Sequence, residues 1–289
     1  MFKGSFTALV TPFTEDGQID HARLTELIEL QVTGGITGIV PVGTTGESPT
    51  LSYDEHINVI ETSVAAAAGR IKVIAGTGAN STEEALSLTQ RAKDAGADGT
   101  LQVTPYYNKP SQEGLYQHFS RVADIGLPVV LYNIPGRTAR EITIDTVARL
   151  AQHPNIVAVK EAAGAVERVS AILHVCDLTV LSGDDVLTLP MMSVGGSGVI
   201  SVASNVTPDL VSTMVQAGLD ERWSDALALH NRLYPLFNAL LSLDTNPVPI
   251  KAAMALKGLI PDTYRLPMCP ISDENRAALQ SVMTATGLL

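Results

Sequence analysis

Eight short apolar segments rich in strand-forming residues recur along the chain, and each is separated from the next by a stretch long enough for a helix. Their side chains are continuously apolar, without alternating polar ones, which is typical of parallel strands covered on both faces. Eight consecutive strand–helix units predict an α/β fold, the closed (β/α)8 or TIM barrel. The predicted strands span residues 6–10, 38–42, 73–75, 100–103, 129–132, 156–160, 179–181 and 199–202.

A doubly wound open sheet is the alternative arrangement of such units. That fold would normally carry a glycine-rich nucleotide-binding pattern after its first strand, and residues 6–14 contain no such pattern. A chain of 289 residues is commonly one α/β barrel. We therefore expect a barrel with the catalytic site in residues 1–222 and a C-terminal helical region, packed on the barrel, in residues 223–289. Helical patterns after the eighth strand span residues 208–217, 221–241, 251–259 and 273–286.

The composition excludes several kinds of partner. A formal net charge of −11 argues against nucleic acid and anionic membranes. The two cysteines are too few for a disulfide framework, and neither they nor the six histidines show metal-ligand spacing. No segment has the length of a membrane span, and Pro12 interrupts the only apolar run near the N-terminus. We expect a cytoplasmic protein without a metal ion.

Lys160 ends the sixth predicted strand, Ile156–Lys160. With the ordinary pKa of about 10.4, fewer than about one lysine in a thousand is neutral at pH 7, whereas a pKa lowered by roughly three units leaves about a quarter neutral. A neutral lysine attacks carbonyl carbons and forms Schiff bases. Isolated lysines are more often exposed or paired, here with Glu161, so the interpretation depends on the surroundings of Lys160.

The turn Gly43–Ser48 directly follows the second predicted strand. Its glycines permit a sharp bend, and its amides and hydroxyls can converge on a carboxylate. A turn of this kind is by itself usually only a loop. In a (β/α)8 barrel, however, all strands end at one mouth, so this turn is expected to lie near Lys160 and to form a carboxylate-binding site.

Tyr132 and Arg137 supply two further groups at the predicted mouth. Tyr132 ends the fifth strand, and a phenol beside a Schiff-base amine can relay protons because its oxygen both donates and accepts. Arg137 follows a Pro-Gly turn, and its planar guanidinium suits a second carboxylate. The alternatives are a tyrosine that caps a buried strand end and an arginine in solvent. Two carboxylate sites imply a reaction with two substrates.

Six motifs distributed over Phe2–Leu289 resemble the dihydrodipicolinate synthase family. That family belongs, with N-acetylneuraminate lyase, to the pyruvate-dependent class I aldolases. The synthase is favoured over its relatives by the combination of the pair Thr44-Thr45, the pair Tyr106-Tyr107 and Arg137. The motifs are residues 43–47, 104–108, 132–138, 160–162, 182–185 and 246–251.

The resemblance implies a set of catalytic residues. Lys160 forms a Schiff base with pyruvate, and Tyr132 shuttles protons. Thr44 links Tyr132 to Tyr107, which reaches the site from a neighbouring subunit. The implied assembly is a homotetramer, a dimer of dimers. No metal or organic cofactor is implied, because Lys160 itself serves as the electron sink.

The resemblance also implies how the two substrates are held. Thr45 binds the carboxylate of pyruvate, and Arg137 binds that of L-aspartate 4-semialdehyde, while the backbone at Gly183 and Ile200 lines the pocket. The enamine of pyruvate attacks the aldehyde, and cyclisation releases Lys160. The product, 4-hydroxy-tetrahydrodipicolinate, enters lysine and diaminopimelate biosynthesis.

Feedback inhibition by L-lysine at a subunit interface is a further implication. Glu84 would pair with the ε-ammonium group of the effector, although Ser81 and Glu84 also have the spacing of a capping box that starts a helix. Tyr53 stands where lysine-sensitive members usually carry histidine, and Pro49 where they often carry alanine. Either departure can weaken binding without abolishing it, so inhibition is still expected and its affinity stays open. The expected lysine-binding residues are Ser48, His56, Asn80, Glu84 and Tyr106.

Two other functions stay open. The first is another pyruvate-dependent 2-oxo acid aldolase or lyase of the same family, which would share the Schiff base but not the need for Arg137. The second is a non-catalytic barrel that senses a keto acid or an amino acid. The combination of Lys160, Tyr132, Thr44 and Tyr107 argues against a sensor, because a sensor needs no proton relay.

Overall fold

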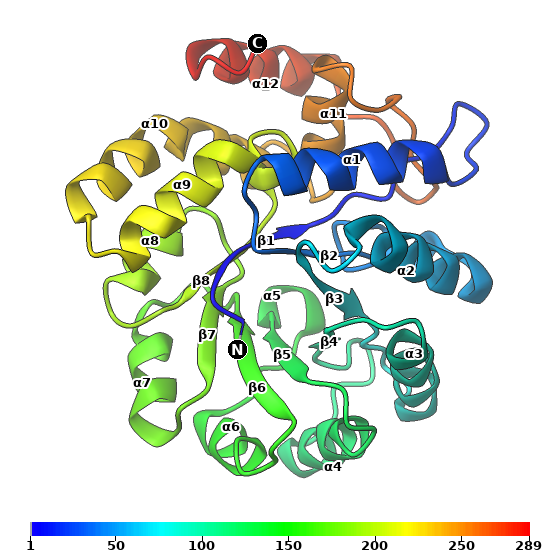
Figure 1. Cartoon of the computed structure of the whole chain (residues 1–289), viewed down its shortest axis with the longest axis vertical. Helices are drawn as coiled ribbons and strands as arrows, with labels where there is room; N and C mark the ends of the chain where they lie inside the picture. The colour runs from blue at the N-terminus through cyan, green and yellow to red at the C-terminus, as the bar shows by residue number, and fades with distance from the viewer. Residues whose placement is uncertain (1) are drawn as a thin grey trace.

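Residues 2–289 of the chain are described by a computed structural model, and they confirm the predicted closed barrel. Its eight parallel strands follow one another in sequence order, and β8 closes the barrel by pairing with β1. The strands form the centre of the molecule, with helices around them (Figure 1). The strands are β1 Gly4–Ala8, β2 Gly38–Val40, β3 Lys72–Gly76, β4 Gly99–Val103, β5 Val129–Asn133, β6 Ile156–Glu161, β7 Thr179–Ser182 and β8 Gly198–Ser201.

β1 and β2 each end two residues earlier than the sequence predicts, a larger difference than the single residue by which β8 ends early. β2 ends at Val40 because Pro41 has no N–H to donate to the ladder and Val42 takes a left-handed conformation with φ of 50°. β1 ends at Ala8 because the N–H of Val10 donates to the side chain of Asn205 and not to a neighbouring strand. Both changes occur at the carboxyl ends, where the chain leaves the barrel to form the mouth.

Polar residues start several of the outer helices. The side chains of Asp20, Ser52, Ser81, Ser111 and Thr143 each accept a hydrogen bond from the first turn of the helix that follows. The helices of the barrel are α1 His21–Thr33, α2 Tyr53–Ala67, α3 Thr82–Asp94, α4 Gln112–Ala123, α5 Pro135–Thr138, α6 Ile144–Leu150, α7 Glu167–Val175, α8 Thr188–Met192 and α9 Pro208–Leu219, with 3-10 turns η1 Ser48–Thr50 and η2 Ala203–Asn205.

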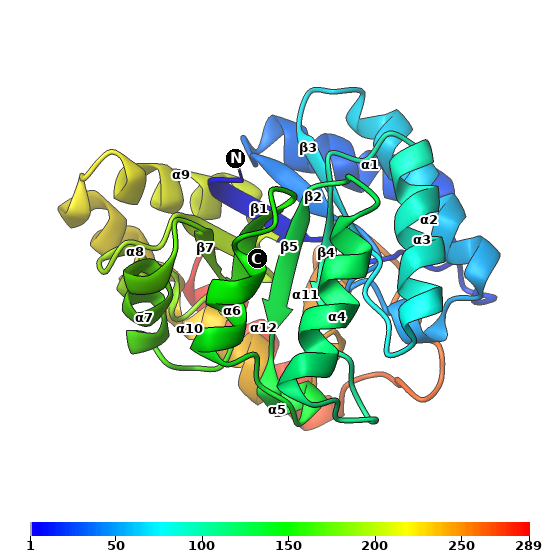
Figure 2. The ribbon, with the colours of Figure 1, turned by 90° about the horizontal axis from the view of Figure 1, so that it is seen from below.

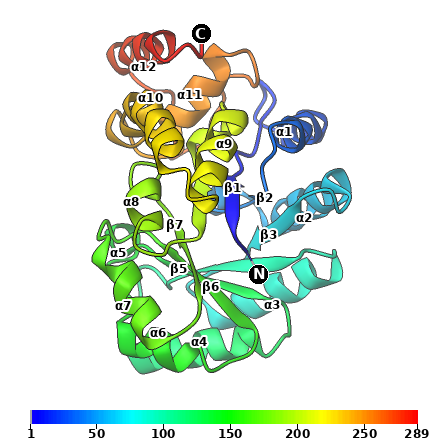
Figure 3. The same ribbon diagram turned by 60° about the vertical axis from the view of Figure 1, so that its left-hand side comes forward.

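Three helices follow α9 and pack against one side of the barrel (Figure 3). They are α10 Trp223–Ser242, α11 Val248–Leu256 and α12 Asp273–Ala285. α11 begins earlier than the expected residue 251 because proline is tolerated in the first turn of a helix. Leu233 and Phe237 of α10 belong to the same buried apolar cluster as Val199 of β8 and Val10. The C-terminal region therefore shares a core with the barrel.

The register of β5 and β6 sets the geometry of the mouth. Tyr132 pairs with Lys160, and Asn133 pairs with Glu161. Because successive side chains of a strand point to opposite faces, Tyr132 and Lys160 face the barrel interior, whereas Asn133 and Glu161 face the surrounding helices. Figure 2 shows β5 pointing toward α5, at the end of the barrel where these residues lie.

The described residues show neither a transmembrane helix nor a metal-binding cluster. No helix within residues 2–289 is long and apolar enough to cross a membrane. In the same part of the chain, no group of three or more His, Cys, Asp or Glu side chains is arranged to hold a metal ion.

Candidate active site

Lys160 is buried at the carboxyl end of β6, with 6% of its surface exposed. Its Nζ lies 4.2 Å from the centre of the Tyr132 ring. Burial lowers the pKa of this amine from 10.5 to about 7; the nearby charge of Asp185 raises it and that of Arg137 lowers it further. Glu161 is directed to the opposite face of the sheet and binds Arg168 and Asn133, so it is not the partner of Lys160.

The environment of Lys160 requires a small residue at position 183. A Cβ atom added to Gly183 would lie 3.1 Å from Cε of Lys160 and 2.7 Å from Cβ of Ala162. Gly183 therefore leaves room for the lysine side chain. Ile200 is fully buried in the interior apolar cluster that also contains Tyr132.

Tyr132 is protonated at neutral pH. Burial raises the pKa of its phenol to about 12, while the charge of Arg137 and the nearby Thr44 side chain lower it. Thr44 and Tyr132 line the same cavity, and the expected relay between them stays a prediction. A neutral phenol beside a partly neutral amine can donate a proton as well as accept one.

A cavity of about 210 Å³ opens at this mouth. Thr44, Tyr132 and Arg137 line it, and its size suits small metabolites more than drug-sized ligands. Lys160 and Thr45 are not among its lining residues; both are buried, next to Tyr132 and Thr44 respectively.

Asn246 joins the two residues expected to bind substrate carboxylates. Its side-chain amide donates to Oγ1 of Thr45 at 3.0 Å, and its backbone carbonyl accepts from the guanidinium of Arg137 at 3.0 Å. Asn246 lies in the motif at residues 246–251, but its sequence position predicts no role for it. Nothing local could have predicted these contacts, because Asn246 lies 201 residues from Thr45 and 109 from Arg137.

A buried ion pair connects the turn Gly43–Ser48 to α11. Nζ of Lys251 lies 2.5 Å from the carboxylate of Glu47, and the two side chains are 0% and 1% exposed. Lys251 also lies over the rings of Phe13 and Tyr264. This pair is not predicted from the sequence. Its only local signal is a lysine within the apolar run Val248–Met254.

Tyr107 does not join the site within one chain. It lies between β4 and α4 with a left-handed φ of 73°, and 90% of its surface is exposed. It is not among the residues that line the cavity. Its expected role in a neighbouring subunit therefore stays a prediction.

A second cavity, of about 250 Å³, adjoins the first. Four of the five expected lysine-binding residues line it: Ser48, His56, Glu84 and Tyr106. Asn80 is not among the lining residues, and its carbonyl accepts a hydrogen bond from the Asn108 side chain at 2.8 Å. Ser48, Pro49, Gly78 and Tyr106 line both cavities, so the two share a wall.

The carboxylate of Glu84 is not used to start α3. Oγ of Ser81 accepts a hydrogen bond from the Glu84 backbone at 3.5 Å, but no reciprocal bond to the Glu84 carboxylate occurs among the described residues. By contrast, Ser52 and Glu55 at the start of α2 form a capping box with both bonds. Burial raises the pKa of Tyr106, and the negative charge of Glu84 raises it further.

The buried lysine of lowered pKa, the adjoining phenol and the (β/α)8 barrel define a Schiff-base aldolase-type enzyme. Residues 1–286 match the sequence model of the Dihydrodipicolinate synthetase family, and the chain belongs to this family.

Three relatives illustrate the similarity. The 4-hydroxy-tetrahydrodipicolinate synthase of Pelobacter propionicus is 50% identical, with all of both chains covered. The chloride-inhibited dihydrodipicolinate synthase of Acinetobacter baumannii, solved with pyruvate, is 43% identical and superposes with a TM-score of 0.98 over all of both chains. The enzyme of Cyanidioschyzon merolae, solved with lysine bound, is 42% identical with a TM-score of 0.96, covering 100% of this chain and 99% of that one.

Proposed function

We propose that this protein condenses pyruvate with L-aspartate 4-semialdehyde to 4-hydroxy-tetrahydrodipicolinate, for lysine and diaminopimelate biosynthesis in the cytoplasm. The observation that carries the proposal is the buried amine of Lys160, with a pKa of about 7 and Tyr132 beside it. At this pKa, about half of the amine is neutral at pH 7. Such an amine is a competent nucleophile without a metal or an organic cofactor.

The reaction proceeds through covalent intermediates on Lys160. The amine attacks the carbonyl carbon of pyruvate, water leaves, and loss of a methyl proton gives an enamine. The enamine attacks the aldehyde carbon of the second substrate. The amino group of that substrate then attacks the Schiff-base carbon, which closes the ring and releases Lys160.

The residues around Lys160 have roles that follow from their protonation and position. Tyr132, neutral at pH 7, donates a proton to the departing hydroxyl and accepts one later, and Thr44 orients its hydroxyl. Thr45 binds the carboxylate of pyruvate, and the backbone at Gly183 and Ile200 lines the pocket. Arg137, whose guanidinium lies at the cavity, binds the carboxylate of the semialdehyde.

Reductive trapping tests the proposal. Borohydride added with pyruvate is expected to inactivate the enzyme and to leave a reduced adduct on Lys160, detected by peptide mass spectrometry. Ring formation from pyruvate and aspartate semialdehyde then distinguishes the synthase from another 2-oxo acid aldolase. An adduct on a different lysine would reject the mechanism. Trapping without ring product would favour the other aldolase, and binding without trapping would favour a sensor.

The exposed position of Tyr107 supports a site that is completed by a second subunit. In this proposal the chain forms a homotetramer, a dimer of dimers, and Tyr107 of one subunit reaches Thr44 of another. Tyr107 is a large aromatic residue, and its 90% exposure in one chain is explained if another subunit covers it in the assembly.

The substitution Tyr107→Phe separates the relay from packing, because it keeps the ring and removes only the hydroxyl. We expect kcat to fall about 100-fold or more, the scale of a lost general acid–base group, with the oligomeric state unchanged. Sedimentation velocity and initial rates measure the two quantities. Full activity in an intact oligomer would show that Tyr107 only packs at the subunit interface.

We infer that L-lysine inhibits the enzyme at the second cavity. Ser48, His56, Glu84 and Tyr106 line this cavity, and the carboxylate of Glu84 is not used as a helix cap. Asn80, whose carbonyl accepts a hydrogen bond from Asn108, would contact the bound lysine from the edge of the cavity. The shared wall with the first cavity provides a route by which an occupant alters the catalytic mouth. The lysine-bound relative supports the inference.

The substitution Glu84→Gln is expected to weaken lysine binding by roughly 10-fold or more, because it removes the charge that pairs with the ε-ammonium group. Calorimetry and initial rates with added lysine provide the measurement. Glu83→Gln is the matched control, since Glu83 is the preceding residue and binds Arg121. Wild-type enzyme with no binding heat and unchanged rates at millimolar lysine would contradict the inference.

A further inference from the structure

A second pair of residues follows the catalytic pair on the same two strands. Asn133 and Glu161 come directly after Tyr132 and Lys160, and they are paired in the same register. Both are fully buried, on the face of the sheet turned toward the helices. A carboxylate in such a place is costly unless donors surround it, so its partners determine where this part of β6 can lie.

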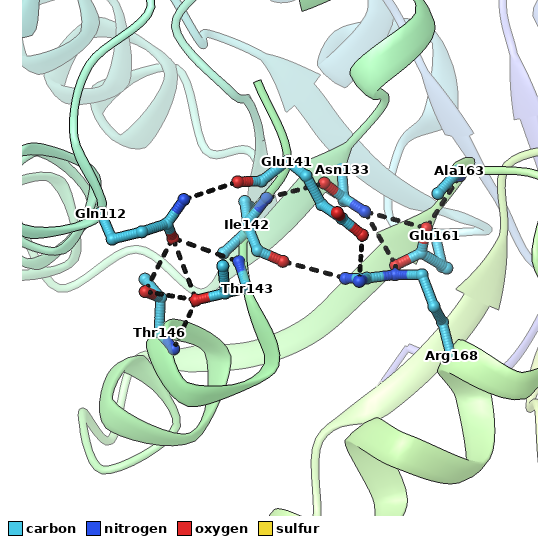
Figure 4. Close-up of polar contacts among 9 residues, drawn as sticks. All are labelled: Gln112, Asn133, Glu141, Ile142, Thr143, Thr146, Glu161, Ala163 and Arg168. Atoms are coloured by element: carbon cyan, nitrogen blue, oxygen red, sulfur yellow. Dashed lines mark hydrogen bonds and ion pairs between the residues drawn. The ribbon is translucent and has the colours of Figure 1, made fainter. Parts of the chain in front are cut away.

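Glu161 is surrounded by donors (Figure 4). The side-chain amide of Asn133 donates to its two carboxylate oxygens at 2.9 and 3.0 Å. The backbone N–H of Ala163 donates at 2.8 Å, and Nε of Arg168 donates at 2.9 Å. The carboxylate thus joins β5, β6 and the start of α7 through charge-assisted bonds.

Arg168 extends these contacts to the segment that follows α5. Its guanidinium forms an ion pair with Glu141 and donates to the carbonyl of Ile142 at 2.9 Å, and its side chain is only 11% exposed. Oδ1 of Asn133 accepts from the N–H of Ile142 at 3.0 Å. This segment directly follows α5, which carries Arg137.

Gln112 connects the segment to the start of α4. Its amide donates to the carbonyl of Glu141 at 2.8 Å, and its Oε1 accepts from Oγ1 of Thr146 at 2.8 Å and from the N–H of Thr143 at 3.1 Å. Figure 4 shows these contacts continuing from Arg168 toward Gln112. The loop with Tyr107 lies immediately before α4, so the network also adjoins this loop.

We propose that Asn133, Glu161 and Arg168, the outer polar clamp, position Lys160 relative to Tyr132 and Arg137 for the reaction. This inference rests on the proposed function. Each clamp residue either adjoins a catalytic residue in the chain or holds the segment that carries one. A misplacement of about 1 Å in a reacting group can cost about 100-fold in rate. A buried ion pair adds little net stability over apolar side chains, so its main contribution here is one defined geometry.

Three variants and one control test the outer polar clamp. Arg168→Met removes the guanidinium group, and Arg168→Lys keeps the positive charge with fewer hydrogen-bond donors. Glu161→Gln places the amide of the new glutamine against the amide of Asn133.

We expect Arg168→Met and Glu161→Gln to lower kcat and the rate of borohydride trapping about 10- to 100-fold. The final extent of trapping and the KM for pyruvate should stay within about twofold, because the turn with Thr45 is held elsewhere. Arg168→Lys should recover part of the rate. Arg121→Met, at an exposed ion pair with Glu83, is the control expected to match the wild type.

These readouts separate positioning from folding. A purely structural role would lower the extent of trapping in proportion to unfolded protein and leave the rate per folded chain unchanged, which would overturn the inference. Wild-type kcat, within about twofold, in Arg168→Met would also overturn it. If Arg168→Met does not fold, the same criteria apply to Glu161→Gln and Arg168→Lys. Failure of wild-type enzyme to trap pyruvate on Lys160 would instead reject the proposed function.

Discussion

Replacing Lys160 with methionine is expected to lower kcat by roughly 10⁴- to 10⁶-fold, the scale seen when a covalent nucleophile is removed. Methionine is unbranched and apolar, so it fills the buried space beside Tyr132 without the cost of desolvating an amine. The variant should therefore fold as stably as the wild type, or more stably. Initial rates, borohydride trapping and thermal unfolding provide the measurements.

Lys72→Met is the matched control. Lys72 also lies on a barrel strand, but its side chain is 58% exposed and pairs with Asp98 at the amino end of β3. Activity and trapping should match the wild type. Residual turnover above about one percent in Lys160→Met would contradict the covalent role of Lys160.

The pH dependence of trapping follows from the same residue. The nucleophile is the neutral amine, and burial lowers its pKa to about 7. The trapping rate should therefore be constant above this pKa and fall about tenfold per pH unit below it, because the ammonium form accumulates. Single-turnover trapping from pH 5 to about 9 would measure the midpoint.

Arg137→Ala is expected to have the second-largest effect. Loss of a charge-assisted contact with a carboxylate should cost roughly 1 to 3 kcal/mol, or about 5- to 150-fold in kcat/KM for aspartate semialdehyde. The KM for pyruvate should change much less. Because the charge of Arg137 also lowers the pKa of Lys160, the acid limb of the trapping profile should move to higher pH.

The control for this substitution is Arg149→Ala. Arg149 is half exposed on α6 and pairs with Glu113 at the surface. Arg149→Ala should leave kcat/KM for both substrates and the pH profile of trapping unchanged. Equal losses for pyruvate and aspartate semialdehyde in Arg137→Ala would contradict the proposed role of Arg137.

The chemical groups at the mouth could be predicted from the sequence because they stand at strand ends. Lys160 and Tyr132 each end an apolar run, and in a barrel such residues meet at one mouth. The exact ends of β1 and β2 could not be predicted, because they depend on the side chain of Asn205 and on the path after Pro41. The spacing of Ser81 and Glu84 allowed a capping box as the alternative role of Glu84, but only one of its two bonds forms.

The sequence by itself determined the barrel, the position of Lys160 at its mouth and the resemblance to one family, since strand patterns and motifs are properties of neighbouring residues. Only the tertiary structure decided which charges are paired. Glu161 binds Arg168 rather than Lys160, and Lys251 binds Glu47 from 204 residues away. Burial and charge pairing depend on which distant segments fold together, and it is burial that lowers the pKa of Lys160 to about 7.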